Sequence, residues 1–262
     1  MRGRLNIWPL FLFALLVGCT DDEYNEENDL SNKLVIEAYV YADEPVDHVK
    51  VSRVHDEGQA APVPLSTANV RITQDDNEFQ LIPHPQDAGT YIQEDTTIAP
   101  SGSGGPLELK ITQDGFTHLS ETSMPSLIQG LSISSDVVDV IPGDTTSVVA
   151  TINWDATENA PGYCIFIRNI GEDATPISGY TPENSAQNPF VIVNHTNQVE
   201  LQGAHFSHFG TYEVYVTAVN QEYINIYSNP SETNLSTAPS NIDHGWGGFT
   251  AFNGQTLTFT VQ

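Results

Sequence analysis

The chain has 262 residues, of which 34 are acidic and eight are basic, so its formal charge at pH 7 is −26. A surface this negative repels nucleic acid and anionic lipid head groups, and it favours solubility without identifying a ligand. The length is sufficient for one large or two modest hydrophobic cores. Thr, Val, Ile and Tyr are frequent, and no window after residue 19 shows a capped helical periodicity. We therefore expect an all-β protein.

The N-terminal residues have the pattern of a secretory signal peptide. Arg2 and Arg4 form a basic start, residues 7–17 are apolar, and Gly18 is a small residue before the expected cleavage site. A transmembrane anchor is the alternative, but it needs about 20 consecutive apolar residues. The run at 7–17 is too short for that. We interpret residues 1–18 as a leader that is removed.

Residues 16–19, Leu-Val-Gly-Cys, resemble the lipobox of bacterial lipoproteins. The resemblance implies that Cys19 becomes a lipidated N-terminus, which leaves Cys164 without a partner for an internal disulfide. Residues 19–32 then form an acidic tether, since residues 20–32 are too polar to offset the entropic cost of ordering them. The tether starts with Thr-Asp-Asp-Glu, which resembles the export signal that sends Bacteroidota lipoproteins to the cell surface. A solvated spacer without an address is the alternative.

Residues 33–123 have the pattern of an N-terminal β-sandwich. Apolar and polar residues alternate in short segments that are separated by turn residues. We expect strands at 34–41, 46–54, 68–73, 78–82 and 107–111. Residues 75–77, Asp-Asp-Asn, are typical of a hairpin turn, and the Gly-rich residues 101–106 are typical of a loop. The order Ala-x-Val-x-Ile, turn, Gly-x-Tyr, loop, Leu-x-Leu-x-Ile resembles transthyretin-like or carboxypeptidase-regulatory-like modules, which usually serve as scaffolds.

Residues 124–228 resemble a fibronectin type III domain. A strand that ends in Trp154 is followed by a second strand at 162–167, and residues 212–220 have the pattern Tyr-x-Val-x-Val-x-Ala-x-Asn. In such a sandwich the tryptophan fills the core, and the tyrosine forms a hydrogen bond back to the preceding turn. We therefore expect Trp154 to be buried and the Tyr212 hydroxyl to bond to the backbone, both as structural residues.

Residues 229–262 are expected to form a loop and a C-terminal β-hairpin, because Asn-Gly at 253–254 favours the type I′ turn of two-residue hairpins. Before this turn, residues 240–252 interleave aromatic residues with glycines. Large aromatics dominate interface energies, and glycines allow a backbone to approach another surface closely. Trp246 and Phe249 are therefore candidates for contact with a partner. The alternative is that this segment folds back over the core, since the following strand needs a sheet to join.

The remaining residues give no signature of catalysis or metal binding. His205 and His208 supply two imidazoles where a metal needs three or four ligands, and we interpret them as exposed loop residues. Residues 75–78 lack the alternating oxygen ligands of a calcium loop. Cys164 is interpreted as a small buried hydrophobe, and no Gly-x-Ser-x-Gly nucleophile elbow occurs. We expect no enzymatic activity, no metal and no cofactor. The short Asp-Thr-x sequon of Bacteroidota O-glycosylation occurs at 95–97 and 144–146.

The whole chain resembles the Bacteroidota lipoproteins catalogued as domain of unknown function 4249. The resemblance comprises the lipobox, a Leu-Val-Ile-Glu-Ala-Tyr-Val strand, the Ala-x-Val-x-Ile strand, the fibronectin-like half and a terminal Ser-Asn-Ile followed by Gly-Gly-Phe. The family often ends with Asn-Ile-x-Gly-Gly-x-Gly-x-Phe, and His244, Trp246 and Gly247 depart from that spacing. Members often lie beside genes for TonB-dependent outer-membrane receptors. The resemblance therefore implies a surface-exposed outer-membrane lipoprotein with an accessory part in nutrient capture or uptake.

Two other classes of function remain open from the sequence. Fibronectin-like sandwiches often serve as spacers and matrix contacts, so a structural or adhesive surface module is the main alternative. A hydrolase with an unrecognised site is a third class, which the missing catalytic signature disfavours. A gene for a TonB-dependent receptor next to this one would favour uptake, whereas adhesin or secretion genes would favour the structural module.

Overall fold

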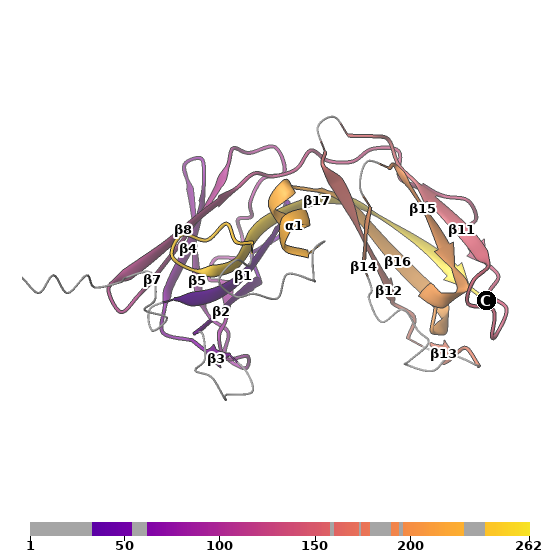
Figure 1. Cartoon of the computed structure of the whole chain (residues 1–262), viewed down its shortest axis with the longest axis horizontal. Coiled ribbons are helices and arrows are strands. Elements are labelled where there is room, and N and C mark those ends of the chain that lie inside the picture. Colours follow the sequence, from indigo (N-terminus) through magenta and orange to yellow (C-terminus); the bar gives the residue numbers. More distant parts are fainter. Residues whose placement is uncertain are drawn as a thin grey trace, which may run out of the picture.

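The computed structural model describes residues 33–53, 62–157, 160–172, 174–178, 190–193, 196–227 and 239–262. Cys19, the leader and the tether lie outside the described residues, so lipidation of Cys19 stays a prediction. The described chain is nearly all β and forms two lobes that meet at the top of an arch (Figure 1). This confirms the expected all-β class. Within these residues no helix combines the length and the apolar character that crossing a membrane requires.

The first lobe contains the N-terminal strands and the first half of the last strand, β17 (Trp246–Val261). The other strands are β1 (Leu34–Tyr41), β2 (His48–Arg53), β3 (Val63–Pro64), β4 (Asn69–Gln74), β5 (Asn77–Pro83), β6 (Thr90–Gln93), β7 (Leu107–Gln113) and β8 (Phe116–Thr122). They pair in the order β17-β1-β2-β6-β5-β4-β7-β8, with β3 beside β2.

One apolar core fills this first lobe. Alternate residues of β1, such as Leu34, Ile36 and Ala38, are buried in the same cluster as residues of β4 and β7. The sheet therefore folds over its own apolar face, as the alternating sequence predicts. The β4–β5 turn at Asp75, whose φ is +52°, confirms the expected hairpin.

Residues 239–245 close the first lobe along the free edge of β8. The Asp243 N–H donates to the Leu119 carbonyl at 2.8 Å. The Asn241 side chain forms hydrogen bonds with the backbone N–H and carbonyl of Phe249 in β17, at 2.9 and 2.7 Å. An unpaired strand edge invites pairing with other chains. This segment protects that edge and links β8 to β17.

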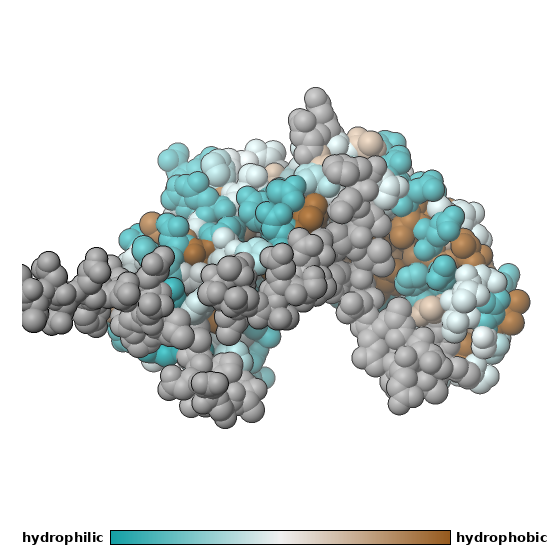
Figure 2. All heavy atoms as spheres, in the orientation of Figure 1, coloured by the Kyte–Doolittle hydropathy of each residue, from teal (hydrophilic) through white to brown (hydrophobic). Residues whose placement is uncertain are grey.

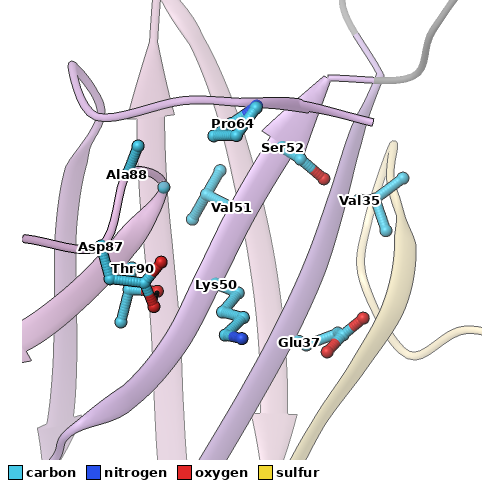
Figure 3. A pocket seen from close by; sticks show the side chains of 10 residues that line it. Val35, Glu37, Lys50, Val51, Ser52, Pro64, Asp87, Ala88 and Thr90 are labelled. Carbon is cyan, nitrogen blue, oxygen red and sulfur yellow. Dashed lines mark hydrogen bonds between the residues drawn. The ribbon is translucent and has the colours of Figure 1, made fainter. Parts of the chain in front are cut away.

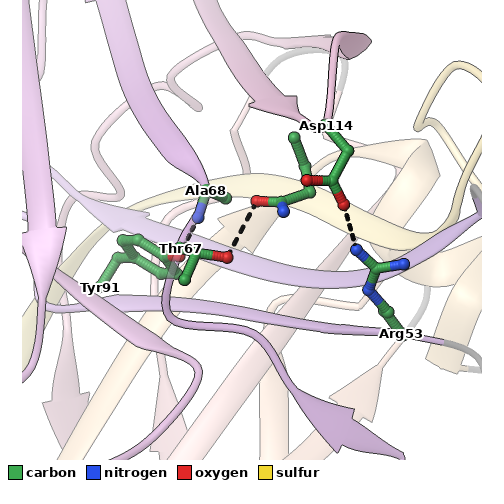
Figure 4. A network of polar contacts seen from close by, with 6 residues as sticks. Arg53, Thr67, Ala68, Tyr91 and Asp114 are labelled. Carbon is green, nitrogen blue, oxygen red and sulfur yellow. Dashed lines mark hydrogen bonds and ion pairs between the residues drawn. The ribbon is translucent and has the colours of Figure 1, made fainter.

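A polar network holds the chain before β4 against β6 and β7 (Figure 4). The buried Tyr91 hydroxyl accepts from the Ala68 N–H and donates to the Leu65 carbonyl, both at 2.9 Å. Thr67 Oγ1 donates to the side-chain oxygen of Gln113 at 3.3 Å. A buried hydroxyl without partners would cost free energy, so these bonds stabilise the tyrosine in the core.

The second lobe is a sandwich of two sheets around a separate core. Its elements are β9 (Ser132–Ile133), β10 (Val137–Val138), β11 (Val148–Asn153), β12 (Gly162–Asn169), β13 (Thr175–Pro176), β14 (Phe190–Val193), β15 (Gln198–Gln202), η3 (Gly203–His205) and β16 (His208–Val219). One sheet has the order β15-β11-β9, and the other has the order β14-β12-β16-β17. This arrangement is fibronectin type III-like. In the space-filling view, hydrophobic residues gather at the surface of this lobe (Figure 2).

The two structural aromatics predicted for the second lobe are confirmed. Trp154 is 2% exposed and makes an edge-to-face contact with Tyr163, with ring centroids 5.1 Å apart. The buried Tyr212 donates its hydroxyl hydrogen to the His208 carbonyl at 2.9 Å. These contacts fix the core and the turn before β16.

The expected C-terminal hairpin is wrong, because β17 is one strand of 16 residues. Its first half pairs in parallel with β1 and its second half pairs antiparallel with β16. The buried Asn253 side chain donates to the carbonyls of Gly102 and Pro125, each at 3.0 Å. At Gly254 an added Cβ would collide with the Val216 carbonyl. These tertiary contacts override the local turn preference, so residues 246–261 belong to the sheets of both lobes.

A third apolar cluster lies at the junction of the lobes, around Phe252. The short helix α1 (Gln221–Tyr227) contributes Tyr223, whose ring centroid is 5.3 Å from that of Phe252. Figure 1 shows α1 beside β17 at the top of the arch. This short helix is compatible with the expected all-β class. Its seven residues make fewer than about two turns, too few for a sustained helical period in the sequence.

Candidate functional site

The two predicted partner-contact residues differ in exposure. Phe249 is fully buried in the first-lobe core, so the prediction that it contacts a partner is wrong. Trp246 is half-buried, with the Lys33 ammonium nitrogen 5.0 Å from the ring centroid, and it stays a candidate. Gly247 has a φ of +100° and lies so close to Ile36 that an added Cβ would collide with its carbonyl. The close approach that this glycine allows is therefore to β1.

The predicted histidines do not form a metal site. The Gln202 N–H donates to His205 Nδ1 at 2.9 Å, and His208 Nδ1 lies 2.8 Å from Ser207 Oγ. Both histidines are half-buried, so the interpretation as exposed loop residues is wrong. Across the described ranges, no group of three or more His, Cys, Asp or Glu side chains is arranged to hold a metal ion.

Cys164 is fully buried, which confirms its interpretation as a small buried hydrophobe. Its Sγ lies 3.6 Å from the Tyr223 hydroxyl. Burial raises the pKa of the thiol to about 12. The reactive form is the thiolate, so this cysteine is inert at neutral pH.

A cleft of about 520 Å³ opens between the lobes, and residues of both lobes form its walls. Its volume is in the range of ligand pockets, which hold roughly 300–1,000 Å³. The end of β1 and the following loop supply Tyr41, Glu44 and Asp47. The second lobe supplies Phe166 from β12 and Tyr215 from β16. This cleft is the best candidate for a functional site.

Strand alternation explains why aromatic residues line the second-lobe wall. Ile165 and Ile167 of β12 are buried in the sandwich core, so Phe166 projects from the opposite face of the sheet. Tyr215 lies directly across from Phe166 on β16, and Thr256 lies across from Tyr215 on β17. The outer face of this sheet thus becomes a wall of the cleft, because β17 holds the first lobe beside it.

Three half-buried rings form the apolar part of the cleft. The Tyr215 centroid is 6.2 Å from that of Tyr41 and 6.1 Å from that of Phe166. Burial raises the pKa of Tyr41 to about 12, and the carboxylate of Asp47 adds to this shift. Burial is also the main cause of the raised pKa of Tyr215. Both phenols are therefore neutral at physiological pH.

The rim of the cleft is acidic. Arg168 and Glu213 neutralise each other, with Nη2 2.6 Å from Oε1. Glu44 and Asp47 are exposed, and among the described residues no lysine or arginine forms an ion pair with either. The imidazole Nδ1 of His48 lies 3.6 Å from the Asp47 carboxylate. Within the described residues, Glu44 and Asp47 thus have no lysine or arginine partner.

This cleft was not predicted from the sequence, because its residues come from four separate segments. One signal was present. Tyr39 and Tyr41 occupy alternate positions of β1, on the opposite face from the core residues Ala38 and Val40. Apolar residues on both faces of a strand indicate that both faces are covered. The outward tyrosines therefore pointed to a second contact surface beside β1.

A smaller pocket of about 140 Å³ lies on the first lobe (Figure 3). Figure 3 shows the Lys50 side chain between the carboxylates of Glu37 and Asp87. Glu37 lies directly across from Lys50 in the β1–β2 pair, and Asp87 accepts a hydrogen bond from Thr90 Oγ1 at 2.7 Å. Its charged groups of opposite sign face each other, so this pocket is a weaker candidate than the cleft.

Comparisons with known proteins give little additional information. A scan against protein-family models finds no match, and a search of curated proteins also finds none. Among solved structures, the FN1–FN3 domains of chicken CNTN1 align over 87% of this chain and 64% of that chain, with 11% sequence identity and a TM-score of 0.28. A likeness this weak supports no functional argument. The fold assignment therefore rests on the strand order of the two lobes.

Proposed function

We propose that this protein is a non-catalytic, lipid-anchored lipoprotein of the outer membrane that faces the cell surface. In this proposal it is an accessory of a TonB-dependent receptor in nutrient capture or uptake. The support from sequence is the lipobox that ends at Cys19, the acidic tether after it and the resemblance of the whole chain to lipoproteins of this kind.

The observation that carries the proposal is the strand β17, which both lobes share. A flexible linker between two domains would have to be ordered on binding, at an entropic cost. Continuous β pairing avoids that cost because it holds the lobes in one arrangement. A preorganised pair of lobes with a cleft between them suits the binding of a partner.

A structural or adhesive surface module is the second candidate. It is favoured by the fibronectin type III-like second lobe, since such sandwiches often act as spacers. Both candidates require the lipid anchor. They differ in the partner, which is an outer-membrane receptor in the first case and matrix or neighbouring cells in the second.

The experiment compares the wild-type protein with Cys19→Ser, each carrying the same C-terminal tag. One acyl chain gives only marginal membrane binding, so the several chains of a mature lipoprotein should hold the wild type firmly in the membrane fraction. Cys19→Ser should be released. Affinity capture of the wild type from solubilised outer membranes should then recover a TonB-dependent receptor. A Cys19→Ser protein that stays in the membrane contradicts the anchor, and capture that recovers no receptor contradicts the accessory role.

A further inference from the structure

The cleft between the lobes has the chemistry of a site for an organic cation. Its walls are aromatic, its rim carries carboxylates, and it belongs to both lobes. We propose that it receives an arginine or lysine side chain of a partner protein. The cationic group would lie between the rings of Tyr41, Phe166 and Tyr215 and the carboxylates of Glu44 and Asp47. The inference rests on the proposed function, because it names the chemistry by which such a partner is held.

The aromatic walls favour a cation over a sugar. The faces of Tyr and Phe rings attract a cation that lies within about 6 Å of the ring centroid. A sugar needs one open ring face on which to stack. Here Tyr41 and Tyr215 meet at an interplanar angle of 63°, and Phe166 and Tyr215 meet at 38°, so the rings enclose a recess rather than a platform.

The rim supplies the complementary charge. Arg168 is held by Glu213, which leaves the carboxylates of Glu44 and Asp47 as the charges that a ligand would meet. The same two carboxylates help to raise the pKa of Tyr41, after burial as the larger cause. A field that disfavours a phenolate favours a cation in the same place.

The net negative charge of the whole chain also favours a cationic ligand. At a formal charge of −26, the protein attracts basic partners over long range and repels acidic ones. This attraction is diffuse, however, and it would operate at any surface. The test must therefore separate binding in the cleft from binding to the net charge.

The probe is the peptide acetyl-Gly-Arg-Gly-Arg-Gly-amide, titrated calorimetrically at about 0.15 M salt, where exposed charges are screened beyond roughly 8 Å. The protein is the mature chain carrying Cys19→Ser. A second peptide has citrulline in place of arginine, which keeps the shape and removes the charge. We expect the arginine peptide to bind and the citrulline peptide to bind at least tenfold more weakly. Equal binding of the two peptides would overturn the proposal and indicate a site for neutral ligands.

Two double variants remove the same net charge from different places. Glu44→Gln with Asp47→Asn removes the rim carboxylates, and we expect a five- to tenfold weaker affinity, since each exposed ion pair contributes modestly. Glu108→Gln with Asp136→Asn removes two exposed carboxylates that do not line the cleft, and we expect less than a twofold change. An equal loss in both would overturn the proposal, because binding would then follow net charge alone.

A ring variant and receptor capture complete the test. Phe166→Leu keeps an apolar wall and removes an aromatic face, so the arginine peptide should bind at least threefold more weakly; unchanged binding would contradict the placement between the rings. Receptor capture by the wild type without any peptide binding would overturn this inference and leave the proposed function standing. Peptide binding without capture of a receptor would support the cation site and contradict the accessory role at a receptor.

Discussion

The two halves of β17 belong to one continuous strand but have different surroundings. In the first half, consecutive residues from Phe249 to Asn253 are all buried, so both faces of the strand are covered. Towards the end of the second half, buried Phe259 and Val261 alternate with exposed residues, as in a strand with one face in solvent. The difference shows that the strand is most enclosed where it passes between the lobes.

This enclosure explains why the lobes form one arch. The first half of β17 pairs with β1 of the first lobe, and the second half pairs with β16 of the second lobe. A relative rotation of the lobes would therefore break backbone hydrogen bonds and expose the cluster around Phe252. Contacts between domains usually allow motion unless they are large and apolar. Here the shared strand adds backbone pairing to the apolar cluster.

The largest effect is expected for Phe252→Ala, because Phe252 packs against both lobes and α1. Its ring centroid is 5.1 Å from that of Tyr41 and 6.0 Å from that of Phe166. The cavity should cost about 3–5 kcal/mol of the free energy of unfolding. The matched control is Phe259→Ala on the same strand, which should destabilise the second lobe without loosening the junction. In urea titrations, Phe252→Ala should reduce the cooperativity of unfolding between the lobes more than Phe259→Ala does. An equal reduction for the two variants would show that the cluster around Phe252 does not couple the lobes.

Trp154→Ala should have a similar cost, about 3–5 kcal/mol, for a different reason. Trp154 is 2% exposed and lies wholly within the second-lobe core. If β17 couples the lobes, the first lobe should lose stability together with the second in a thermal melt. An unchanged melting curve would refute the core role of Trp154.

Asn253→Ala should have a smaller effect, about 1–3 kcal/mol, because it leaves one buried and one partly buried carbonyl without this donor. These carbonyls belong to Gly102 in the first lobe and Pro125 in the connection between the lobes. Asn77→Ala is the control, since Asn77 is exposed and should change stability by less than about 0.5 kcal/mol. Equal urea midpoints for the two variants would show that the amide of Asn253 does not connect the lobes.

Tyr212→Phe should have the smallest effect, about 1 kcal/mol, because it removes one hydroxyl and keeps the ring. The lost hydrogen bonds are the one that the hydroxyl donates to the His208 carbonyl and the weaker one that it accepts from the His208 N–H at 3.2 Å, both far from the junction within the second lobe. Stability measured by urea denaturation should fall slightly, and the arginine-peptide affinity should not change. A large loss of that affinity would mean that the turn before β16 shapes the cleft.

Features that depend on neighbouring residues in the sequence were predicted correctly, and features that depend on long-range contacts were not. The alternation around Ile36 and the pattern around Trp154 and Tyr212 are local, and they predicted strands and core residues correctly. The Asn253-Gly254 signal is also local, yet contacts with Gly102 and Pro125, far away in the chain, decided its conformation. The outward tyrosines of β1 indicate a second contact surface, but the cleft itself depends on the placement of β17 between β1 and β16, which no local pattern predicts.

Whether β17 joins the lobes into one cooperative unit can be measured with the two tryptophans of the mature chain. Trp246 begins the first-lobe half of β17, and Trp154 lies in the second-lobe core. Trp154→Phe and Trp246→Phe each leave a single fluorescent reporter, and each variant is unfolded in urea with far-UV circular dichroism as a second probe. If the lobes unfold together, fluorescence and circular dichroism give the same midpoint in each variant, and this is the result we expect. A reporter that unfolds at a urea concentration different from that of the circular dichroism signal would show that the lobes unfold separately and that β17 does not couple them.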